Sequence, residues 1–214
     1  ISVIGGAGHV GFPLGLIFSS KNFKVTLIDK HKENIKKINS GNVPFLEEGS
    51  QSLLKLSLKK KNIFATNQLN EVIKTKYIIV CIGTPITSSL NPSLKGFINF
   101  FRELKPLLKK NHVLIIRSSI YPGICDQIYK LISSKCQNLS YCPERIVQGK
   151  SISELPKLSQ LVSGKNKKAI IESGKLFKTI CKKIIFTEVI EAELVKLFSN
   201  AYRYVNFSIS NQFY

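Results

Sequence analysis

The stretch Ile1-Ser2-Val3-Ile4-Gly5-Gly6-Ala7-Gly8-His9-Val10-Gly11-Phe12-Pro13 begins the chain and indicates its fold class. A predicted strand leads into a glycine-rich turn, and an amphipathic segment follows near 10–20. Gly6, Gly8 and Gly11 match G-x-G-x-x-G, in which the first glycine permits the tight turn and the second admits a pyrophosphate to the backbone. The third lets the helix pack on the strand, and the helix N-terminus favours the anion. The pattern predicts a dinucleotide site.

Asp29 extends this pattern because it ends the next predicted strand. An acid at that place can accept both ribose hydroxyls of an adenosine and would repel a 2′-phosphate, so NAD is favoured over NADP. Lys30 and Lys32 weaken that preference, and a glycine turn followed by a surface aspartate is the alternative. His9 and Val10 are expected beside the cofactor, with His9 a loop residue and not a catalyst.

Short β-branched runs alternate with amphipathic patterns along most of the chain. The predicted strands are 1–4, 24–29, 62–66, 77–82, 113–118, 139–142 and 184–187, and the predicted helices lie near 10–20, 31–39, 49–60, 94–109, 123–134 and 166–181. This alternation predicts an α/β, Rossmann-like, doubly wound and mostly parallel sheet. The nearly all-apolar strands at 77–82 and 113–117 predict helices on both sheet faces.

The final segment predicts the start of one long central helix. Residues 188–214 contain no Gly or Pro, and apolar residues recur every three to four positions. Thr187 is the expected N-cap, with Glu188 and Glu191 in the positive first turn. We predict an NAD-binding Rossmann domain at 1–186 and a truncated helical, dimerising domain at 187–214. The sequence starts with Ile and contains no Met, so we expect a fragment.

Charge and composition exclude several classes of protein. The 214 residues carry a formal charge of +19 with 43% hydrophobic residues, which argues against a disordered chain. Only four basic residues are Arg (102, 117, 145 and 203), whereas readers of nucleic acid rely on Arg for bidentate contacts. A Lys-rich solvated surface is favoured over a nucleic-acid site, and attraction of anionic ligands is the alternative.

The five cysteines are odd in number and show no paired C-x-x-C spacing, which argues against disulfides and against a zinc or other metal site. A reducing cytoplasm is the expected location. No apolar run is long enough for a membrane span, and no signal-peptide pattern is visible.

Two loops follow predicted strand ends, at 82–85 and 118–123. The carboxyl ends of parallel strands form the ligand crevice of such sheets, so small hydroxyl residues there can bind a ligand or a water. Ordinary turn chemistry explains the same residues equally well.

Six motifs in order carry a resemblance over essentially the whole chain. They are Gly6–Pro13 with Asp29, Pro44–Gly49, Gly83-Thr84-Pro85, Ser118–Gly123, Tyr141–Arg145 and Glu191–Arg203. On these residues the sequence resembles the UDP-glucose/GDP-mannose dehydrogenase family of NAD-dependent nucleotide-sugar dehydrogenases. The Cys-Pro-Glu-Arg form at 142–145 is more similar to the branch acting on UDP-N-acetylhexosamines, such as UDP-N-acetylmannosamine.

The resemblance implies an enzyme that oxidises the C6 hydroxyl of a nucleotide sugar to a carboxylate, for polysaccharide biosynthesis, through a thioester on an active-site Cys. It implies roles for individual residues. The expected NAD contacts are Gly6, Gly8, His9, Val10, Gly11, Asp29, Thr84, Pro85 and Ser119, and the expected catalytic residues are Glu144, Lys196, Asn200 and Ser119. Glu144 would assist thioester hydrolysis, Ser119 would place a water, and Lys196 with Asn200 would stabilise the oxyanion.

The residues support these roles independently. Lys196 and Asn200 are four apart, so they share a helix face, and a cation with an amide donor suits developing negative charge. A solvated pair is the alternative. Glu144 at a strand end could act as a base, or form a salt bridge to Arg145.

Departures from the family pattern limit the prediction. The family's Gly-Gly-x-Cys loop is absent, and Cys142 is interpreted as a strand residue, so we expect NAD binding without turnover. Gln148 stands where the UDP-glucose branch has a second Glu, and Gln212 stands where an acid is common. A non-catalytic NAD-binding regulator, a UDP-glucose or GDP-mannose substrate, and a Lys-based nucleic-acid binder remain the competing hypotheses. The resemblance also implies a homodimer through the long helix.

Overall fold

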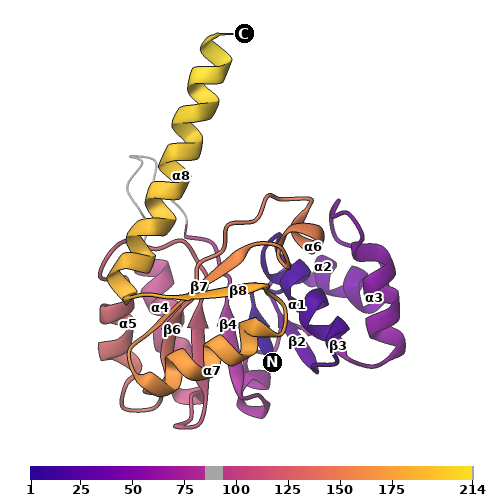
Figure 1. Ribbon diagram of the computed structural model, residues 1–214. Helices are drawn as coiled ribbons and strands as arrows, with labels where there is room; N and C mark the ends of the chain where they lie inside the picture. Colours follow the sequence, from indigo (N-terminus) through magenta and orange to yellow (C-terminus); the bar gives the residue numbers. More distant parts are fainter. Residues whose placement is uncertain (85–93, 214) are drawn as a thin grey trace.

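A mostly parallel sheet of eight strands forms the centre of the computed structural model, which describes residues 1–84 and 94–213 (Figure 1). The strands run in the order β3-β2-β1-β4-β5-β6-β7-β8, and among the described strands only β6 and β7 pair antiparallel. Their bounds are β1 Ser2–Ile4, β2 Val25–Ile28, β3 Ile63–Thr66, β4 Tyr77–Val80, β5 Val113–Ile116, β6 Leu139–Tyr141, β7 Ser159–Gly164 and β8 Lys183–Phe186. The predicted α/β, Rossmann-like class is confirmed.

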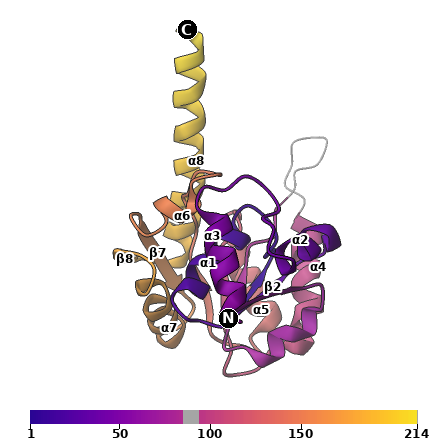
Figure 2. The same cartoon turned by 90° about the vertical axis from the view of Figure 1, so that its right-hand side faces the viewer.

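Helices cover both faces of the sheet, as Figures 1 and 2 show. The α-helices are α1 Gly11–Ser20, α2 Lys32–Asn39, α3 Ser50–Lys59, α4 Leu94–Leu104, α5 Ile124–Ile132, α6 Ser151–Glu154, α7 Lys167–Lys178 and α8 Val189–Gln212, with 3-10 helices η1 Leu69–Lys74 and η2 Lys105–Leu107. One core cluster contains side chains of α1, α3 and α7, and the other contains those of α4 and α5.

Strand β5 is apolar throughout because both of its faces are buried. Val113 and Ile115 belong to the first core cluster, whereas Leu114 and Ile116 belong to the second, and all four are fully buried. Because successive side chains point to opposite faces, a strand covered on both faces has no polar position. The prediction of a doubly covered sheet is therefore confirmed.

The sequence pattern did not predict β7, and the helix that it predicted at 94–109 is longer than the observed α4. β7 pairs antiparallel with β6 and parallel with β8, and its buried Gln160 and Ser163 break the expected apolar run. The helix predicted at 94–109 ends at Leu104, and η2 follows with Pro106 in its first turn. Proline has no N–H for the α-helical hydrogen bond, which explains the early end.

The long helix α8 projects away from the domain (Figure 1). Its N-cap is Glu188 and not the predicted Thr187, because Glu188 and Glu191 form a reciprocal capping box. The Thr187 hydroxyl instead bonds the Glu191 carboxylate from outside the helix. No helix in the described part of the chain is long and apolar enough to cross a membrane.

Candidate active site

The glycine-rich turn joins β1 to α1 at the carboxyl edge of the sheet. The N–H groups of Gly5 and Gly6 donate to Ile28 O at 2.9 and 3.1 Å, which fixes the turn on the end of β2. Gly5, and not Gly6 as the motif spacing predicts, adopts the left-handed backbone with φ of +77°. The tight turn therefore begins one residue earlier, where only glycine avoids a steric penalty.

The three motif glycines differ in how much room each leaves for a Cβ atom. A Cβ on Gly6 would lie 2.6 Å from Val3 O, and one on Gly11 would lie 2.3 Å from Gly5 O, so packing requires glycine at both. A Cβ on Gly8 would meet only Gly5 O, at 3.4 Å. Gly8 leaves bare backbone on the open side of the turn, which is the geometry that suits a pyrophosphate at a helix N-terminus.

Asp29 lies against the glycine turn, at the end of β2. Its side chain is 7% exposed; Oδ2 accepts from Ala7 N at 2.9 Å and Oδ1 from His31 N at 3.1 Å. The His31 ring nitrogen Nδ1 lies 2.8 Å from Oδ1. A carboxylate beside the turn suits the ribose of a dinucleotide, and a ribose hydroxyl at Oδ1 would take the place of the His31 ring.

His9 and Val10 complete the turn. The exposed His9 ring stacks against Phe45, with ring centroids 3.9 Å apart and planes tilted by 37°. Val10 is half-buried and directly precedes α1. His9 thus lies between the glycine turn and the 41–49 loop.

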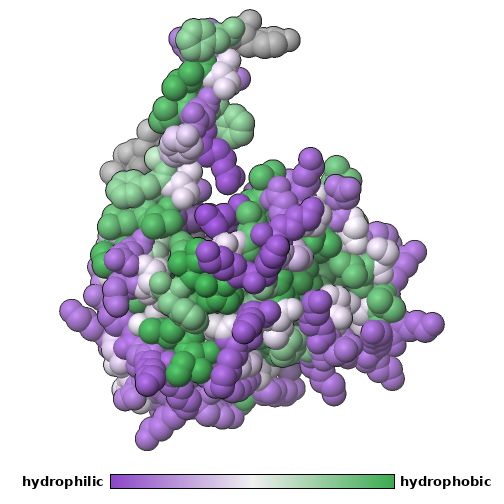
Figure 3. Space-filling view, viewed as in Figure 1, coloured by the Kyte–Doolittle hydropathy of each residue, from purple (hydrophilic) through white to green (hydrophobic). Residues whose placement is uncertain are grey.

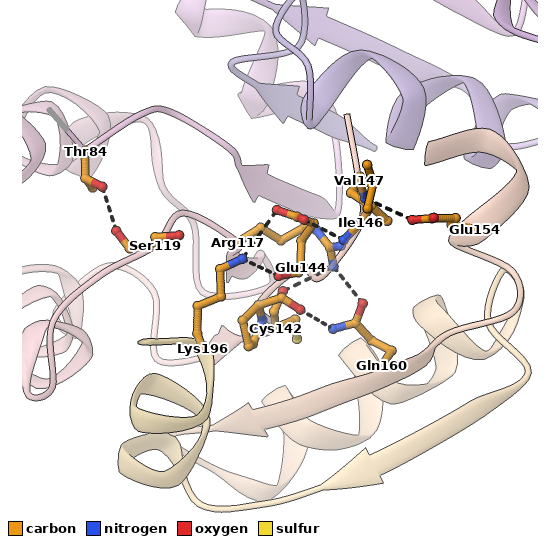
Figure 4. Close-up of polar contacts among 11 residues, drawn as sticks. Thr84, Arg117, Ser119, Cys142, Glu144, Ile146, Val147, Glu154, Gln160 and Lys196 are labelled. Atoms are coloured by element: carbon orange, nitrogen blue, oxygen red, sulfur yellow. Dashed lines mark hydrogen bonds and ion pairs between the residues drawn. The ribbon is translucent and has the colours of Figure 1, made fainter. Parts of the chain in front are cut away.

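The loops after β4 and β5 meet each other. The Thr84 hydroxyl donates to Ser119 O at 2.7 Å (Figure 4). The Ser118 hydroxyl donates to Ile82 O at 2.6 Å. Pro85, the remaining predicted cofactor contact, lies outside the described residues. The sheet therefore brings Thr84 and Ser119 together near the point where strand order reverses between β1 and β4.

Glu144 and Lys196 form the second part of the site. Lys196 Nζ donates to Glu144 O at 2.5 Å and lies 3.7 Å from Glu144 Oε2, although 52 residues separate them (Figure 4). Their side chains are only 7% and 12% exposed, respectively. Glu144 Oε1 accepts from Ile146 N at 2.7 Å, which orients the carboxylate. The Arg145 guanidinium donates to Ser159 O at 3.0 Å.

Burial lowers the pKa of Lys196, and the positive charges of Arg117 and Arg203 lower it further, while Glu144 opposes the shift. A buried ammonium loses its hydration, and only nearby negative charge restores part of the loss. Lys196 therefore releases a proton more readily than a surface lysine while still offering a cation beside Glu144.

Arg117 is a site residue to which the sequence pattern assigned no role. It is 3% exposed, and Nη1 donates to Cys142 O at 3.1 Å and to Gln160 Oε1 at 2.8 Å (Figure 4). Gln160 Nε2 in turn donates to Pro143 O at 2.9 Å. These bonds hold the Cys142-Pro143 backbone immediately before Glu144. An Arg ending an all-apolar strand was the available signal.

Glu47 links two loops in the same way. It is 4% exposed; Oε2 accepts from Gly149 N and Ser151 Oγ at 3.1 Å each, and Oε1 from Ile152 N at 3.2 Å. The 41–49 loop beside His9 is thereby tied to the segment that follows Glu144. Glu47 lies in the Pro44–Gly49 motif, but the sequence pattern predicted no role for it.

The outer part of α8 borders a groove of about 480 Å³. Asn200 is exposed one turn beyond Lys196, and Gln148 and Gln212 are exposed too. The groove contains two guanidinium groups, and most of its remaining lining surface is apolar. Its lining is Arg145, Leu158, Ser199, Tyr202, Arg203, Asn206, Phe207 and Ser210. Its volume is in the range of small-molecule sites.

The cysteines do not offer a nucleophile. All five are free thiols, and burial raises the pKa of both Cys81 and Cys142 to about 12. The thiolate is the reactive form, so neither is activated. Among the described residues, no cluster of His, Cys, Asp and Glu could hold a metal ion.

Comparison with known proteins yields one family. Residues 1–184 match the NAD binding domain of the UDP-glucose/GDP-mannose dehydrogenase family. UDP-N-acetyl-D-mannosamine dehydrogenases of Methanococcus maripaludis and Pyrococcus horikoshii are 27% and 28% identical, each over 97% of this chain. The matches cover 49% and 51% of those proteins, so the chain spans about half the length of the curated relatives.

Solved structures of dehydrogenases share the fold of this chain. The UDP-D-ManNAc dehydrogenase of Pyrococcus horikoshii superposes with a TM-score of 0.91 at 27% identity, over 100% of this chain and 53% of that one. GDP-mannose dehydrogenase of Pseudomonas aeruginosa gives 0.89 at 20% identity, over 98% of this chain and 51% of that one, and supports the fold alone.

Proposed function

Because the chain belongs to the UDP-glucose/GDP-mannose dehydrogenase family, of which it holds the NAD binding domain, we propose that it serves the oxidation of a nucleotide-sugar C6 hydroxyl to the uronate. The proposed substrate is a UDP-N-acetylhexosamine, and the product would supply polysaccharide biosynthesis. The UDP-N-acetyl-D-mannosamine dehydrogenases among its relatives support that choice over UDP-glucose or GDP-mannose. Residues 1–186 would form the cofactor domain and 187–214 the start of a helical one.

The cofactor half of the proposal rests on the glycine turn. NAD, when bound, takes up the two electrons of each oxidation. The open backbone at Gly8 would receive the pyrophosphate at the N-terminus of α1, and Asp29 would accept the ribose hydroxyls. Thr84 and Ser119 would border the dinucleotide where the two loops meet.

The catalytic half rests on the contact between Glu144 and Lys196, which is the observation that carries the proposal. The Lys196 ammonium would stabilise negative charge on the substrate oxygen, with the Asn200 amide one turn away. Glu144 would hold the hydrolytic water and accept its proton, and Ser119 would help to place that water. Desolvation raises the pKa of all five thiols, so the chain would contribute the acid–base and cofactor groups and not the nucleophile.

The groove beside α8 supports an anionic substrate. Arg145 and Arg203 both line it, and guanidinium groups bind phosphate in a bidentate manner. The groove continues the face of α8 that carries Lys196, so a sugar near Lys196 would direct its diphosphate toward the two Arg. The five free thiols suit the reducing cytoplasm that we propose as its location.

The exposed face of α8 supports self-association. Large apolar side chains follow the helix beyond the domain (Figure 3); those outside the groove include Phe198, Val205 and Ile209. We propose that a second copy of α8 covers them in a homodimer, because exposed apolar patches of this kind mark interaction surfaces. Sedimentation equilibrium tests this: a monomer at all concentrations contradicts it.

Titration calorimetry with NAD and NADP tests the cofactor half directly. We expect NAD to bind, NADP to bind more weakly, and Asp29→Ala to abolish NAD binding. Glu33→Ala is the matched control, because Glu33 is an exposed acid on the neighbouring helix α2. Binding of UDP-N-acetylmannosamine to the NAD-loaded chain, weakened by Lys196→Ala, would support the catalytic half. A chain that binds neither NAD nor NADP contradicts the proposal.

A further inference from the structure

Helix α8 is attached to the domain by few side chains. Of its 24 residues, only Ala192, Glu193 and Lys196 are buried, and two of these three carry charge. An apolar face permits small sliding and rotation, whereas a buried charge must stay with its hydrogen-bond partners. The orientation of α8 therefore depends on where Glu193 and Lys196 find their partners.

Glu193 binds the start of α5. It is 1% exposed; Oε2 accepts from Gly123 N at 2.7 Å and Oε1 from Cys125 N at 2.9 Å. Gly123 is the N-cap of α5, with φ of +89°, and has no side chain to cap the helix itself. A carboxylate from another helix supplies the cap, and the α5 dipole favours its charge.

The same contact joins two parts of the candidate site. Gly123 ends the loop that carries Ser119, and Lys196 follows Glu193 by three residues on the same face of α8. Lys196 Nζ in turn reaches Glu144. Both partners of Glu193 are backbone N–H groups, whose positions are fixed by the fold and cannot follow a shifting helix.

We propose that Glu193 is a positioning residue, which fixes the rotation and register of α8 so that Lys196 meets Glu144 beside the Ser119 loop. The catalytic significance of that placement rests on the proposed function, whereas the placement itself does not. No substitute preserves both bonds: a glutamine offers one acceptor and turns its NH₂ group toward the second backbone N–H.

The test uses Glu193→Gln, with Asp126→Asn as the matched control. Asp126 lies in the first turn of the same helix α5, but its carboxylate pairs with Lys165 and not with α8. In Glu193→Gln we expect hydrogen exchange at the Gly123 and Cys125 amides to rise at least tenfold. In Asp126→Asn it should change less than threefold. Unchanged exchange in Glu193→Gln overturns the proposal.

The titration of Lys196, followed by NMR after ¹³C-methylation, separates positioning from charge. The charged groups facing Lys196 are Glu144, Arg117 and Arg203. Removing a negative charge alone would lower the pKa of Lys196 further, whereas release of α8 would hydrate the ammonium and raise its pKa toward the ordinary 10.5. We expect the rise, and a fall overturns the proposal.

A second variant guards against simple unfolding. Glu193→Asp keeps the charge but is one methylene shorter, so it should lose one bond and give an intermediate Lys196 titration. A wild-type Lys196 titration in a folded Glu193→Asp variant that has lost protection at both amides overturns the proposal. NAD titration of the same samples tests the proposed function separately. Absence of NAD binding to every sample would refute the proposed function and leave the Glu193 result standing.

Discussion

Substitution of the motif glycines by alanine separates the glycine needed for binding from those needed for folding. In Gly11→Ala the new Cβ would lie 2.3 Å from Gly5 O, and neither backbone can yield cheaply. Overpacking costs about 1–3 kcal/mol, and a helix gains about 1 kcal/mol from Gly to Ala. Because 2.3 Å is shorter than the contacts that real Cβ atoms make, we take the upper end of the overpacking cost. The unfolding free energy should therefore fall by about 2 kcal/mol, or roughly 4–8 °C in melting temperature for a chain of this length.

Gly8→Ala should behave in the opposite way. Its Cβ would meet only Gly5 O at 3.4 Å, an ordinary contact, and the unfolded chain would lose about 0.4–1 kcal/mol of conformational entropy. We expect unchanged or slightly raised stability. The methyl group would occupy the side on which a pyrophosphate approaches, so NAD affinity should fall at least tenfold, or about 1.4 kcal/mol.

Urea unfolding and NAD calorimetry on Gly6→Ala, Gly8→Ala and Gly11→Ala provide the assay. Gly6→Ala should resemble Gly11→Ala, because its Cβ would lie 2.6 Å from Val3 O. The reasoning is refuted if Gly8→Ala loses as much stability as Gly11→Ala, or if it binds NAD as tightly as the wild type.

Three further predictions concern charged side chains. Asp29→Asn should weaken NAD binding about tenfold, whereas His31→Ala should strengthen it because the imidazole ring no longer occupies Oδ1; equal calorimetric affinities would contradict this. Because the pKa of Lys196 is lowered in the folded state, the unfolded chain binds more protons between that lowered value and 10.5. The urea-derived unfolding free energy of the wild type should therefore rise with pH relative to Lys196→Met in that window, and a constant difference is the contrary result. Glu47→Gln should cost about 2 kcal/mol in urea unfolding by weakening three hydrogen bonds to a charged acceptor, whereas Glu48→Gln, at an exposed neighbour, should cost under about 0.5 kcal/mol.

The local pattern of the sequence was enough for most of the fold. The seven strands predicted from β-branched runs all exist, and the all-apolar β5 correctly indicated helices on both faces. β7 was not predicted because its buried polar residues are satisfied from other strands: the Ser163 hydroxyl donates to Tyr141 O, and Gln160 accepts from Arg117. A pattern of hydropathy cannot show that a polar side chain has a distant partner.

The candidate site likewise has a part that the sequence predicts and a part that only the folded structure shows. The glycine turn and Asp29 are predictable because a strand, a turn and a helix N-terminus are consecutive in the chain, and their hydrogen bonds follow from that order. The sequence by itself therefore determined the α/β class and predicted where a dinucleotide would bind. Only the tertiary structure decided that Lys196 meets Glu144, and that Arg117, Glu47 and Glu193 hold the elements around them. Their partners are mostly backbone carbonyl and N–H groups, which every residue possesses, so only the folded path of the chain selects which of them lies within hydrogen-bond distance.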